Sequence, residues 1–438
     1  MVFGNDVIVF SDKEIAWSND KDVSTAWKRW HRRAVLEGVK QLRGAERWIR
    51  DFPDRLFLDR ACTVRFPFPI PDLARIRFHL VVVAHGAGSA CREQHGGSGS
   101  LMLTPRLGST SDLPFSVGDL DSTKSFVHVL DDASLDIVMS HCDTAADISS
   151  YLQRKEAFVR SGQLLSAAGE EELLAYYLTH TDSFGHHAFI FGNSSAQILL
   201  DEGHYSGFAT NPQLIAKRSA DEKSYLWDSL IEAFSKNVVQ STLYYSSSPE
   251  VSHHEQGLRI LASEPRVRRR MLANALLEMA HDPNGHELRR LRVVTGPEGG
   301  TYYAFLCLRH RESETYDEYR EVRRNLLLAY ARTIRLLLDD AATIVGIGLD
   351  FPSPAPSSED LLVYDGSSFG PEERAEAERV RKELNLLTDV KEFAAVEHEY
   401  PSAPTSRDQA RARSSLHRNA PCPCGSGKKY RECCRRST

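Results

Sequence analysis

Apolar side chains recur at helical spacing in several long stretches of this 438-residue chain. The first stretch covers residues 24–51, with an apolar side chain every three or four positions until Phe52-Pro53 ends the pattern. The same spacing predicts further helices, in pieces from 134 to 177 and then at 221–240, 265–280, 315–338 and 371–387. Polar side chains fill the other positions, so each helix is predicted to cover a core with one side and to face solvent with the other.

Runs of β-branched and aromatic residues between these segments predict strands. The most apolar run is 76–84, which suits a buried strand. A Gly-rich turn at 296–300 is predicted to join a strand pair. In chain order the predicted strands are 56–58, 76–84, 126–130, 187–191, 292–294 with 302–308, and 344–348 with 360–364. Alternation of helices and strands predicts a mixed α/β body.

Composition fits a globular body with flexible parts. Hydrophobic residues make up 41% of the chain and charged residues 26%, which is ordinary for a protein that buries a sizeable core. The stretch 85–118 is rich in Gly and Ser and has little periodicity, so it predicts a long loop. We expect two α/β regions, a Pro- and Ser-rich flexible linker and a small C-terminal unit, at 1–118, 119–398, 399–418 and 419–438 respectively.

The chain lacks the sequence features of membrane and secreted proteins. It contains no run of eighteen apolar residues, and its N-terminus carries Asp6, Asp12 and Glu14 where a signal peptide has a basic and then an apolar segment. We therefore expect a cytoplasmic protein without a membrane span. In a reducing compartment, the four cysteines scattered through the body are expected to be small buried apolar residues: Cys62, Cys91, Cys142 and Cys307.

Charge is unevenly distributed along the chain. Residues 406–438 contain nine Lys and Arg against two acidic residues, so they carry +7. The whole chain carries −6, which leaves −13 for the remainder. A basic tail predicts an acidic partner, either nucleic acid or an acidic protein surface. The alternative is that the tail contacts the acidic body of its own chain.

Four cysteines near the C-terminus carry the most specific chemistry. They stand as a C-x-C pair and a C-C pair separated by eight residues, and Gly425 and Gly427 allow the turns that bring the pairs together. Four thiolates around one ion are typical of a structural zinc site, which has no open position for catalysis. A segment whose one aromatic residue is Tyr430 builds no core, so we expect it to be unfolded without metal.

This segment resembles the SEC-C motif, a small zinc-binding unit found at the end of the preprotein translocase motor SecA and on many otherwise unrelated proteins. The resemblance rests on Asn419, Pro421–Tyr430 and Cys433-Cys434. It implies that zinc is held by Cys422, Cys424, Cys433 and Cys434. The family's units dock proteins, ribosomes or nucleic acid and are not catalytic. Bases around the site would offset the negative charge of four zinc-bound thiolates and form the partner-binding surface: Lys428, Lys429, Arg431, Arg435 and Arg436.

In the body, no motif identifies an active site. The stretch His85-Gly-Ala-Gly-Ser89 is similar to the oxyanion loop of α/β-hydrolases, but the chain has no G-x-S-x-G to supply a nucleophile. Histidine pairs, at 186–187 and at 281 and 286, are expected to be exposed or hydrogen-bonded and not to bind metal. The arginines at 266 and 268–270 predict a solvated helix face.

One arrangement in the body suggests an alternative function. A helix carrying Glu46, a strand ending at Asp59 and a second strand carrying His79 resemble the start of a restriction-endonuclease-like nuclease. Such enzymes hold Mg²⁺ with an acid on one strand and an E-x-K on the next. His79 stands where an acid is needed and no E-x-K follows, so the resemblance is to a degenerate member.

The body also resembles large uncharacterised bacterial proteins with the same zinc tail, some of them encoded beside phage-defence genes. That resemblance implies no residue role. The first hypothesis is therefore a bacterial cytoplasmic adaptor or effector that docks a partner through its zinc tail. The alternative is a nuclease or other nucleic-acid-processing protein of a phage-defence system. The sequence leaves open whether the body is an enzyme.

Overall fold

A computed structural model describes most of the chain. The described residues are 1–68, 70, 72–107, 112–192, 197–240, 251–281, 286–311, 313–352, 358–392 and 397–402. The four predicted zinc ligands and the five predicted partner-binding bases lie outside these ranges.

The described residues form twelve strands and thirteen α-helices. The strands are β1 (Val2–Phe3), β2 (Asp6–Glu14), β3 (Arg77–His85), β4 (Met102–Leu103), β5 (Ser116–Val117), β6 (Val127–Asp131), β7 (Leu164–Ala167), β8 (Ile198–Leu200), β9 (Arg289–Thr295), β10 (Thr301–Leu308), β11 (Thr343–Asp350) and β12 (Asp360–Asp365). The helices are α1 (Val23–His31), α2 (Glu37–Asp51), α3 (Gly88–His95), α4 (Ser134–His141), α5 (Ala145–Arg160), α6 (Glu170–Thr179), α7 (His204–Ala209), α8 (Pro212–Asp221), α9 (Tyr225–Val239), α10 (Val251–Ala262), α11 (Arg266–Ala280), α12 (Tyr316–Leu337) and α13 (Pro371–Leu384). This mixture confirms the predicted mixed α/β body.

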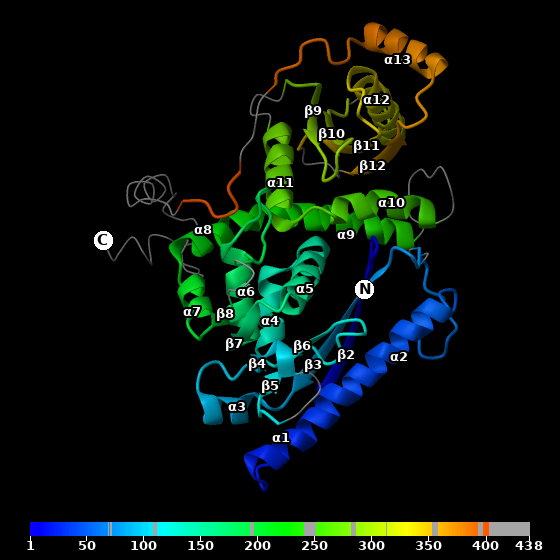
Figure 1. The fold of residues 1–438 in the computed structure, drawn as a ribbon. Helices are drawn as coiled ribbons and strands as arrows, with labels where there is room; N and C mark the ends of the chain where they lie inside the picture. The colour runs from blue at the N-terminus through cyan, green and yellow to red at the C-terminus, as the bar shows by residue number, and fades with distance from the viewer. Residues whose placement is uncertain are drawn as a thin grey trace, which may run out of the picture.

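The first sheet has the order β1-β2-β3-β6. Strands β2, β3 and β6 are parallel, and β1 pairs with β2 in the antiparallel sense. Residues 80–84 of β3 are buried, as expected for a central strand of a parallel sheet. Helices α1 and α2 run in one line along the outer edge of the molecule, coloured blue in Figure 1, and contact β2 and β3.

A π-helical turn, Arg32–Leu36, joins α1 to α2. It inserts one extra residue into the helix, so that the buried side chains before and after it stay on the same face. Before the turn Trp27 and Trp30 are buried, and after it Val39 and Leu42 are buried. The predicted long amphipathic helix at 24–51 is confirmed, with this one interruption.

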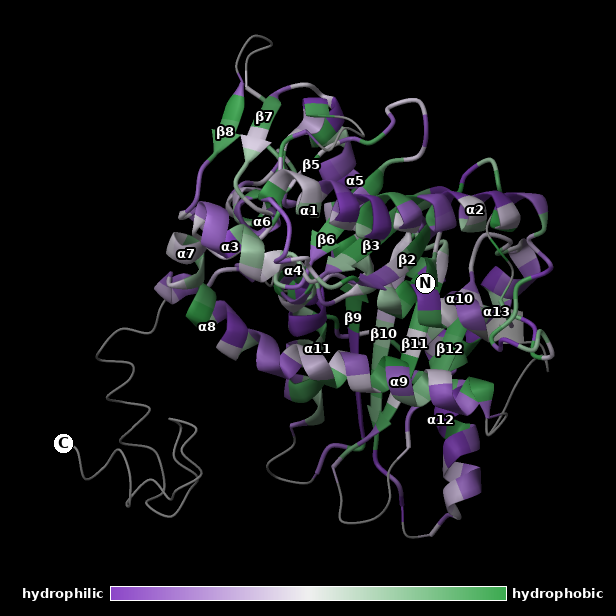
Figure 2. Cartoon of the chain, turned by 90° about the horizontal axis from the view of Figure 1, so that it is seen from below, coloured by the Kyte–Doolittle hydropathy of each residue, from purple (hydrophilic) through white to green (hydrophobic). Residues whose placement is uncertain are grey.

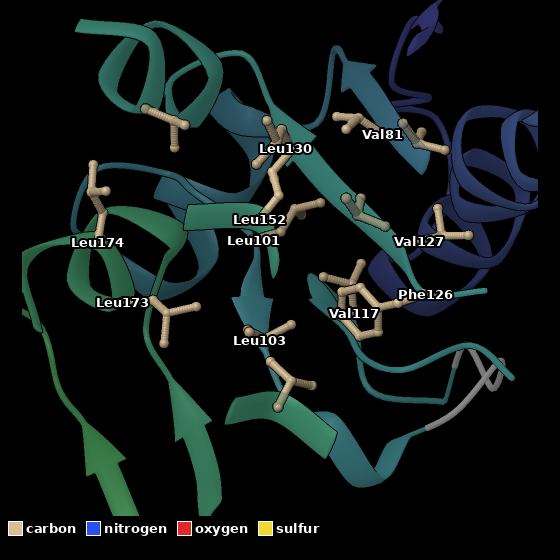
Figure 3. Close-up of a cluster of buried hydrophobic side chains, with 14 of the residues drawn as sticks. Val81, Leu101, Leu103, Val117, Phe126, Val127, Leu130, Leu152, Leu173 and Leu174 are labelled. Carbon is tan, nitrogen blue, oxygen red and sulfur yellow. The ribbon is translucent and has the colours of Figure 1, made fainter. Parts of the chain in front are cut away.

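The second sheet has the order β5-β4-β7-β8 and packs against the first through one hydrophobic cluster. Figure 3 shows this cluster, in which Val81 of β3, Leu103 of β4 and Phe126 before β6 share a core with Leu152 of α5 and Leu173 of α6. The strand pairs of these sheets join residues on both sides of position 118. The predicted domain boundary at 118 stays a prediction.

The third sheet has the order β12-β11-β10-β9 and separates one further hydrophobic cluster from two others. Alternate residues of β10 face opposite sides, as the pleat of a strand requires. Tyr303 and Phe305 pack with Trp227 of α9, whereas Ala304 packs with Ile334 of α12. Figure 2 shows the apolar residues of β10 and β11 in green, with purple positions alternating along α9 and α11. Both predicted strand pairs in this region are confirmed.

Three predictions of local structure are wrong. Residues 56–58 form no strand, and Phe57 makes one isolated bridge to Arg65. Residues 187–191 form no strand either, because Phe189 packs its ring against Phe158 over 4.6 Å instead of joining a sheet. The predicted loop at 85–118 contains α3, β4 and β5.

The body cysteines are free thiols. Cys91, Cys142 and Cys307 are buried as predicted, whereas Cys62 is exposed, contrary to the prediction. Burial raises the pKa of Cys91 to about 12, so this thiol stays protonated. Among the described residues, no helix has both the length and the apolar character needed to cross a bilayer.

Candidate functional site

The three parallel strands of the first sheet end side by side. Glu14 of β2 is level with His85 of β3, and Ala84 is level with Asp131 of β6. Open α/β proteins bind ligands at this carboxyl edge, because side chains from several strands meet there. This edge carries the candidate site of the body.

The imidazole of His85 lies between two carboxylates at this edge. Its Nδ1 atom is 2.6 Å from Oδ1 of Asp132, and its Nε2 atom is 2.9 Å from Oδ1 of Asp12. A histidine donates at both nitrogens when it is protonated. Partial burial lowers the pKa of His85, but the hydrogen bonds and negative charges of Asp132 and Asp12 outweigh burial and raise that pKa above its ordinary value. The charged imidazolium is therefore favoured more than in a free histidine.

Two residues hold the backbone around His85. Gly86 has a φ of +101°, and a Cβ atom there would lie 2.2 Å from the carbonyl oxygen of Ile15. Its N–H donates to Oδ2 of Asp132 over 3.1 Å. The indole N–H of Trp30 donates to the carbonyl oxygens of Ile15 and His85, at 3.0 and 3.1 Å. Helix α1 is therefore bonded directly to the ends of β2 and β3.

A cavity of about 660 Å³ opens at this edge. Its lining consists of Asp12, Glu14, Ile15, Ala16, His85, Gly86 and Asp132. Three carboxylates outnumber the single imidazole whether that ring is charged or neutral, so the cavity has a negative potential, which favours a cationic ligand over an anionic one. Within the described ranges, no group of three His, Cys, Asp or Glu residues is arranged to hold a metal ion.

The residues on which the nuclease hypothesis rests do not line this cavity, and each makes hydrogen bonds to other parts of the body. The Glu46 carboxylate accepts from Arg50 over 3.0 Å and from the Ser125 hydroxyl over 2.7 Å. The Asp59 carboxylate accepts from the backbone N–H groups four and five residues further on and so closes a local turn. His79 is buried on β3, with Nε2 2.8 Å from Oδ1 of Asp6. The structure does not bring Glu46, Asp59 and His79 into one site.

The arginines at the start of α11 form a buried ion-pair network instead of the predicted solvated face. Arg266 pairs with Asp143 over 2.9 Å and with Asp228 over 2.6 Å. Arg270 is 1% exposed and pairs with Asp221 over 3.0 Å. The acidic partners of Arg266, Arg269 and Arg270 lie 38 to 127 residues away in the sequence. A local pattern does not show such distant partners, so it predicts a solvated face.

The last described segment, 397–402, returns to this network. Arg270 pairs with Glu397 over 2.7 Å and donates to the carbonyl oxygen of His398 over 2.6 Å. His187 lies 2.9 Å from the Glu399 carboxylate, and the ring of Tyr400 contacts His187 with 6.1 Å between the centroids. His187 is therefore paired with a carboxylate, in agreement with the prediction of an exposed or hydrogen-bonded histidine. The first residues of the predicted linker are anchored on the body.

The sequence pattern missed the cavity at the strand ends because it missed β2. Residues 11–14 of that strand are Ser, Asp, Lys and Glu, which hide the β-branched run at 7–9. One signal could have indicated the site: His85 and Asp132 each follow a predicted apolar strand, and parallel pairing would place them at one edge.

Comparisons with known proteins concern a small C-terminal segment of the chain. The SEC-C motif family model matches residues 418–436. The protein translocase subunit SecA of Phocaeicola vulgatus is 43% identical over 63 residues, which are 14% of this chain and 6% of that SecA. The corresponding subunit of Bacteroides fragilis is 40% identical over 63 residues, with the same coverage. No solved structure matches the chain. The chain therefore carries a SEC-C motif at its C-terminal end.

Proposed function

We propose that this chain is a zinc-binding adaptor or effector whose SEC-C tail docks an acidic partner, either a protein or a nucleic acid. The observation that carries the proposal is the SEC-C match at 418–436. In this proposal the zinc ligands are Cys422, Cys424, Cys433 and Cys434. The partner-binding bases are Lys428, Lys429, Arg431, Arg435 and Arg436.

The donor chemistry of the tail fits zinc. Four thiolates are a complete tetrahedral set for Zn²⁺, and a complete set serves structure because no position is left for substrate. Zinc bound there would supply the folding energy of a segment too short to build a core. The residues of the tail would then present their basic side chains in a fixed arrangement.

The anchoring of residues 397–400 supports a docking role. Because Glu397 pairs with Arg270 and Glu399 with His187, the last described residues before the tail are held at a defined place on the body. A partner held by the tail would be brought to that side of the body. The charge of +7 on residues 406–438 supports an acidic partner.

The test compares partners recovered from cells of the source organism by the full chain and by two variants. The variants are a deletion of 419–438 and the substitutions Lys428→Gln and Lys429→Gln. Loss of the same partners in the deletion, with weaker recovery in the Gln variant, is the expected result. Recovery of every partner by the deletion variant would show that the tail does not dock them.

A second candidate is a nucleic-acid-processing enzyme that resembles restriction-endonuclease-like nucleases but lacks their usual metal-binding residues. The cavity at the ends of β2, β3 and β6 supports an enzyme in general, because enzymes of open α/β folds use this edge. Its three carboxylates repel phosphate, so a nucleic-acid substrate would need a cation between the two. Here His85 and Asp132 replace Glu46 and Asp59 as the residues to test. Turnover of DNA or RNA that needs Mg²⁺ or Mn²⁺ and is lost on His85→Gln would favour the enzyme, and the absence of turnover would favour the adaptor.

A further inference from the structure

The solvent-exposed side of α1 and α2 is strongly basic. Residues 23–68 contain eleven Lys and Arg against five acidic residues, so they carry +6 within a body of −13. Inside the helical segment 23–51, the exposed charged residues are seven bases against Glu37 and Asp51. The exposed bases are Lys28, Arg29, Arg32, Arg33, Lys40, Arg47 and Arg50.

Most of these basic residues have no acidic partner in the part of the chain that the structure describes. Lys28 pairs with Asp112 over 3.5 Å, and Arg50 pairs with Glu46 over 3.0 Å. The other five make no ion pair with any described residue: Arg29, Arg32, Arg33, Lys40 and Arg47. We call these five residues the basic stripe. A charge that stabilises no internal contact is free to bind an external anion.

The basic stripe has the length and chemistry of a surface for nucleic acid. Its ends are eighteen residues apart, which is about 27 Å along a helix, close to one turn of a duplex at about 34 Å. Four of its five members are arginines, whose planar guanidinium groups donate two parallel hydrogen bonds to a phosphate. Figure 1 shows α1 and α2 on the outside of the molecule, where a long polyanion can lie along them.

An aromatic group continues the stripe at the end of α2. Trp48 and Phe52 are 45% and 41% exposed, and the guanidinium group of Arg55 lies 5.6 Å from the Trp48 ring centre. Exposed aromatic rings beside arginines can stack on nucleobases. An anionic lipid surface or an acidic peptide has no nucleobases for these rings to stack on. The apolar face of the helix is buried against the first sheet, so it is not available for insertion into a bilayer.

We propose that the basic stripe binds the phosphate backbone of nucleic acid, and that Trp48 and Phe52 contact nucleobases at the end of the stripe formed by α2. This inference does not depend on zinc binding or on the C-terminal tail. It also does not require the cavity at His85 to be catalytic. It assigns the body an interaction surface of its own.

The test measures binding of the full chain to fluorescently labelled 25-base-pair DNA, RNA duplex and single-stranded DNA by anisotropy. The stripe variant carries Arg29→Gln, Arg33→Gln, Lys40→Gln and Arg47→Gln. The matched control variant loses the same charge from four other exposed helix positions that make no ion pair among the described residues: Arg218→Gln, Lys223→Gln, Lys236→Gln and Lys382→Gln. Circular dichroism checks that both variants are folded. A third variant, Cys422→Ser with Cys424→Ser, removes the tail's contribution.

We expect the stripe variant to bind at least one of these nucleic acids about 100-fold more weakly at 0.1 M salt, because each phosphate contact contributes about 0.9 to the slope of log affinity against log salt. The control and the cysteine variant should keep most of the affinity. Equal binding by the stripe and control variants would overturn the inference, as would the absence of nucleic-acid binding by the full chain. Loss of binding in the cysteine variant alone would assign the nucleic acid to the tail. Stripe-dependent binding to phosphatidylserine vesicles without binding to nucleic acid would assign the stripe to membranes and would also overturn it.

Discussion

The indole nitrogen of Trp30 on α1 lies 3.1 Å from the carbonyl oxygen of His85 at the end of β3. The same N–H group also reaches the carbonyl oxygen of Ile15, 3.0 Å away, just after β2. One buried donor therefore joins the helix of the basic stripe to two strands at the edge where the acidic cavity opens. The basic surface and the acidic cavity of this body share one rigid framework.

Replacing this donor tests the framework. Trp30→Phe keeps a large apolar ring but leaves two carbonyl oxygens without their partner, so we expect a loss of about 1–2 kcal/mol in the free energy of unfolding. Trp27→Phe is the matched control, since Trp27 is equally buried and its indole nitrogen has no hydrogen-bond partner among the described residues. Urea denaturation measures both. Equal losses in the two variants would contradict the role of the Trp30 hydrogen bonds.

The backbone at Gly86 is expected to be intolerant of a side chain. Gly86→Ala should cost at least about 2 kcal/mol, because the residue has a φ of +101° and the new Cβ would meet the carbonyl oxygen of Ile15. Gly207→Ala on α7 is the control: nothing lies within 4 Å of its added Cβ, and alanine favours a helix by about 0.5 kcal/mol or more. Thermal unfolding compares the two variants. A stable Gly86→Ala protein would mean that the edge has a different backbone geometry.

Stability should depend on pH through His85. Its pKa in the folded state is raised above the ordinary value of 6.5, so its contribution is complete below pH 6.5 and is lost as pH rises through the folded-state pKa. Because Asp12 is 76% and Asp132 44% exposed, solvent weakens the pair, and we expect about 0.5–1 kcal/mol. The measurement is the difference in unfolding free energy between the wild-type protein and His85→Gln at pH 5.5 and pH 8.5. A difference that grows toward high pH would contradict the account.

The contact between Arg270 and Glu397 is expected to hold the segment before the tail. Arg270→Met removes the ion-pair partner of Glu397, 2.7 Å away, and leaves Asp221 with Lys217 as its one ion-pair partner among the described residues. Because buried carboxylates would lose their partner, we expect a loss of about 3 kcal/mol in the free energy of unfolding. We also expect faster proteolysis within 397–402. Arg374→Met, at an exposed position on α13, should change neither quantity. Unchanged proteolysis in the Arg270 variant would mean that other contacts anchor the segment.

Much of the fold could be predicted from local patterns. The β-branched run of β3 and the apolar spacing of α12 describe single elements, and a single element is what a local pattern encodes. The fold class followed from their alternation. The apolar run at Phe189 predicts a strand that does not form, because burial of a ring by other aromatic rings leaves the same sequence pattern as burial in a sheet.

Of the candidate sites, too, those formed by residues close in sequence could be predicted, and those formed by distant residues could not. The four tail cysteines lie within thirteen residues, so their chemistry is visible in the sequence. Asp12, His85 and Asp132 lie at or just after the ends of three strands, and they come together because β3 pairs with both β2 and β6. Strand order depends on the packing of the whole domain, which no local pattern shows. The basic stripe required knowledge of which bases have acidic partners.

Zinc content tests the central claim most directly. The purified full chain should contain one zinc ion by elemental analysis, because four tail thiolates complete a tetrahedral site. The variant Cys422→Ser with Cys424→Ser should contain none, whereas Cys62→Ser, at an exposed body cysteine, should keep the ion. A full chain without zinc, or an unchanged zinc content in the Cys422 and Cys424 variant, would contradict the account.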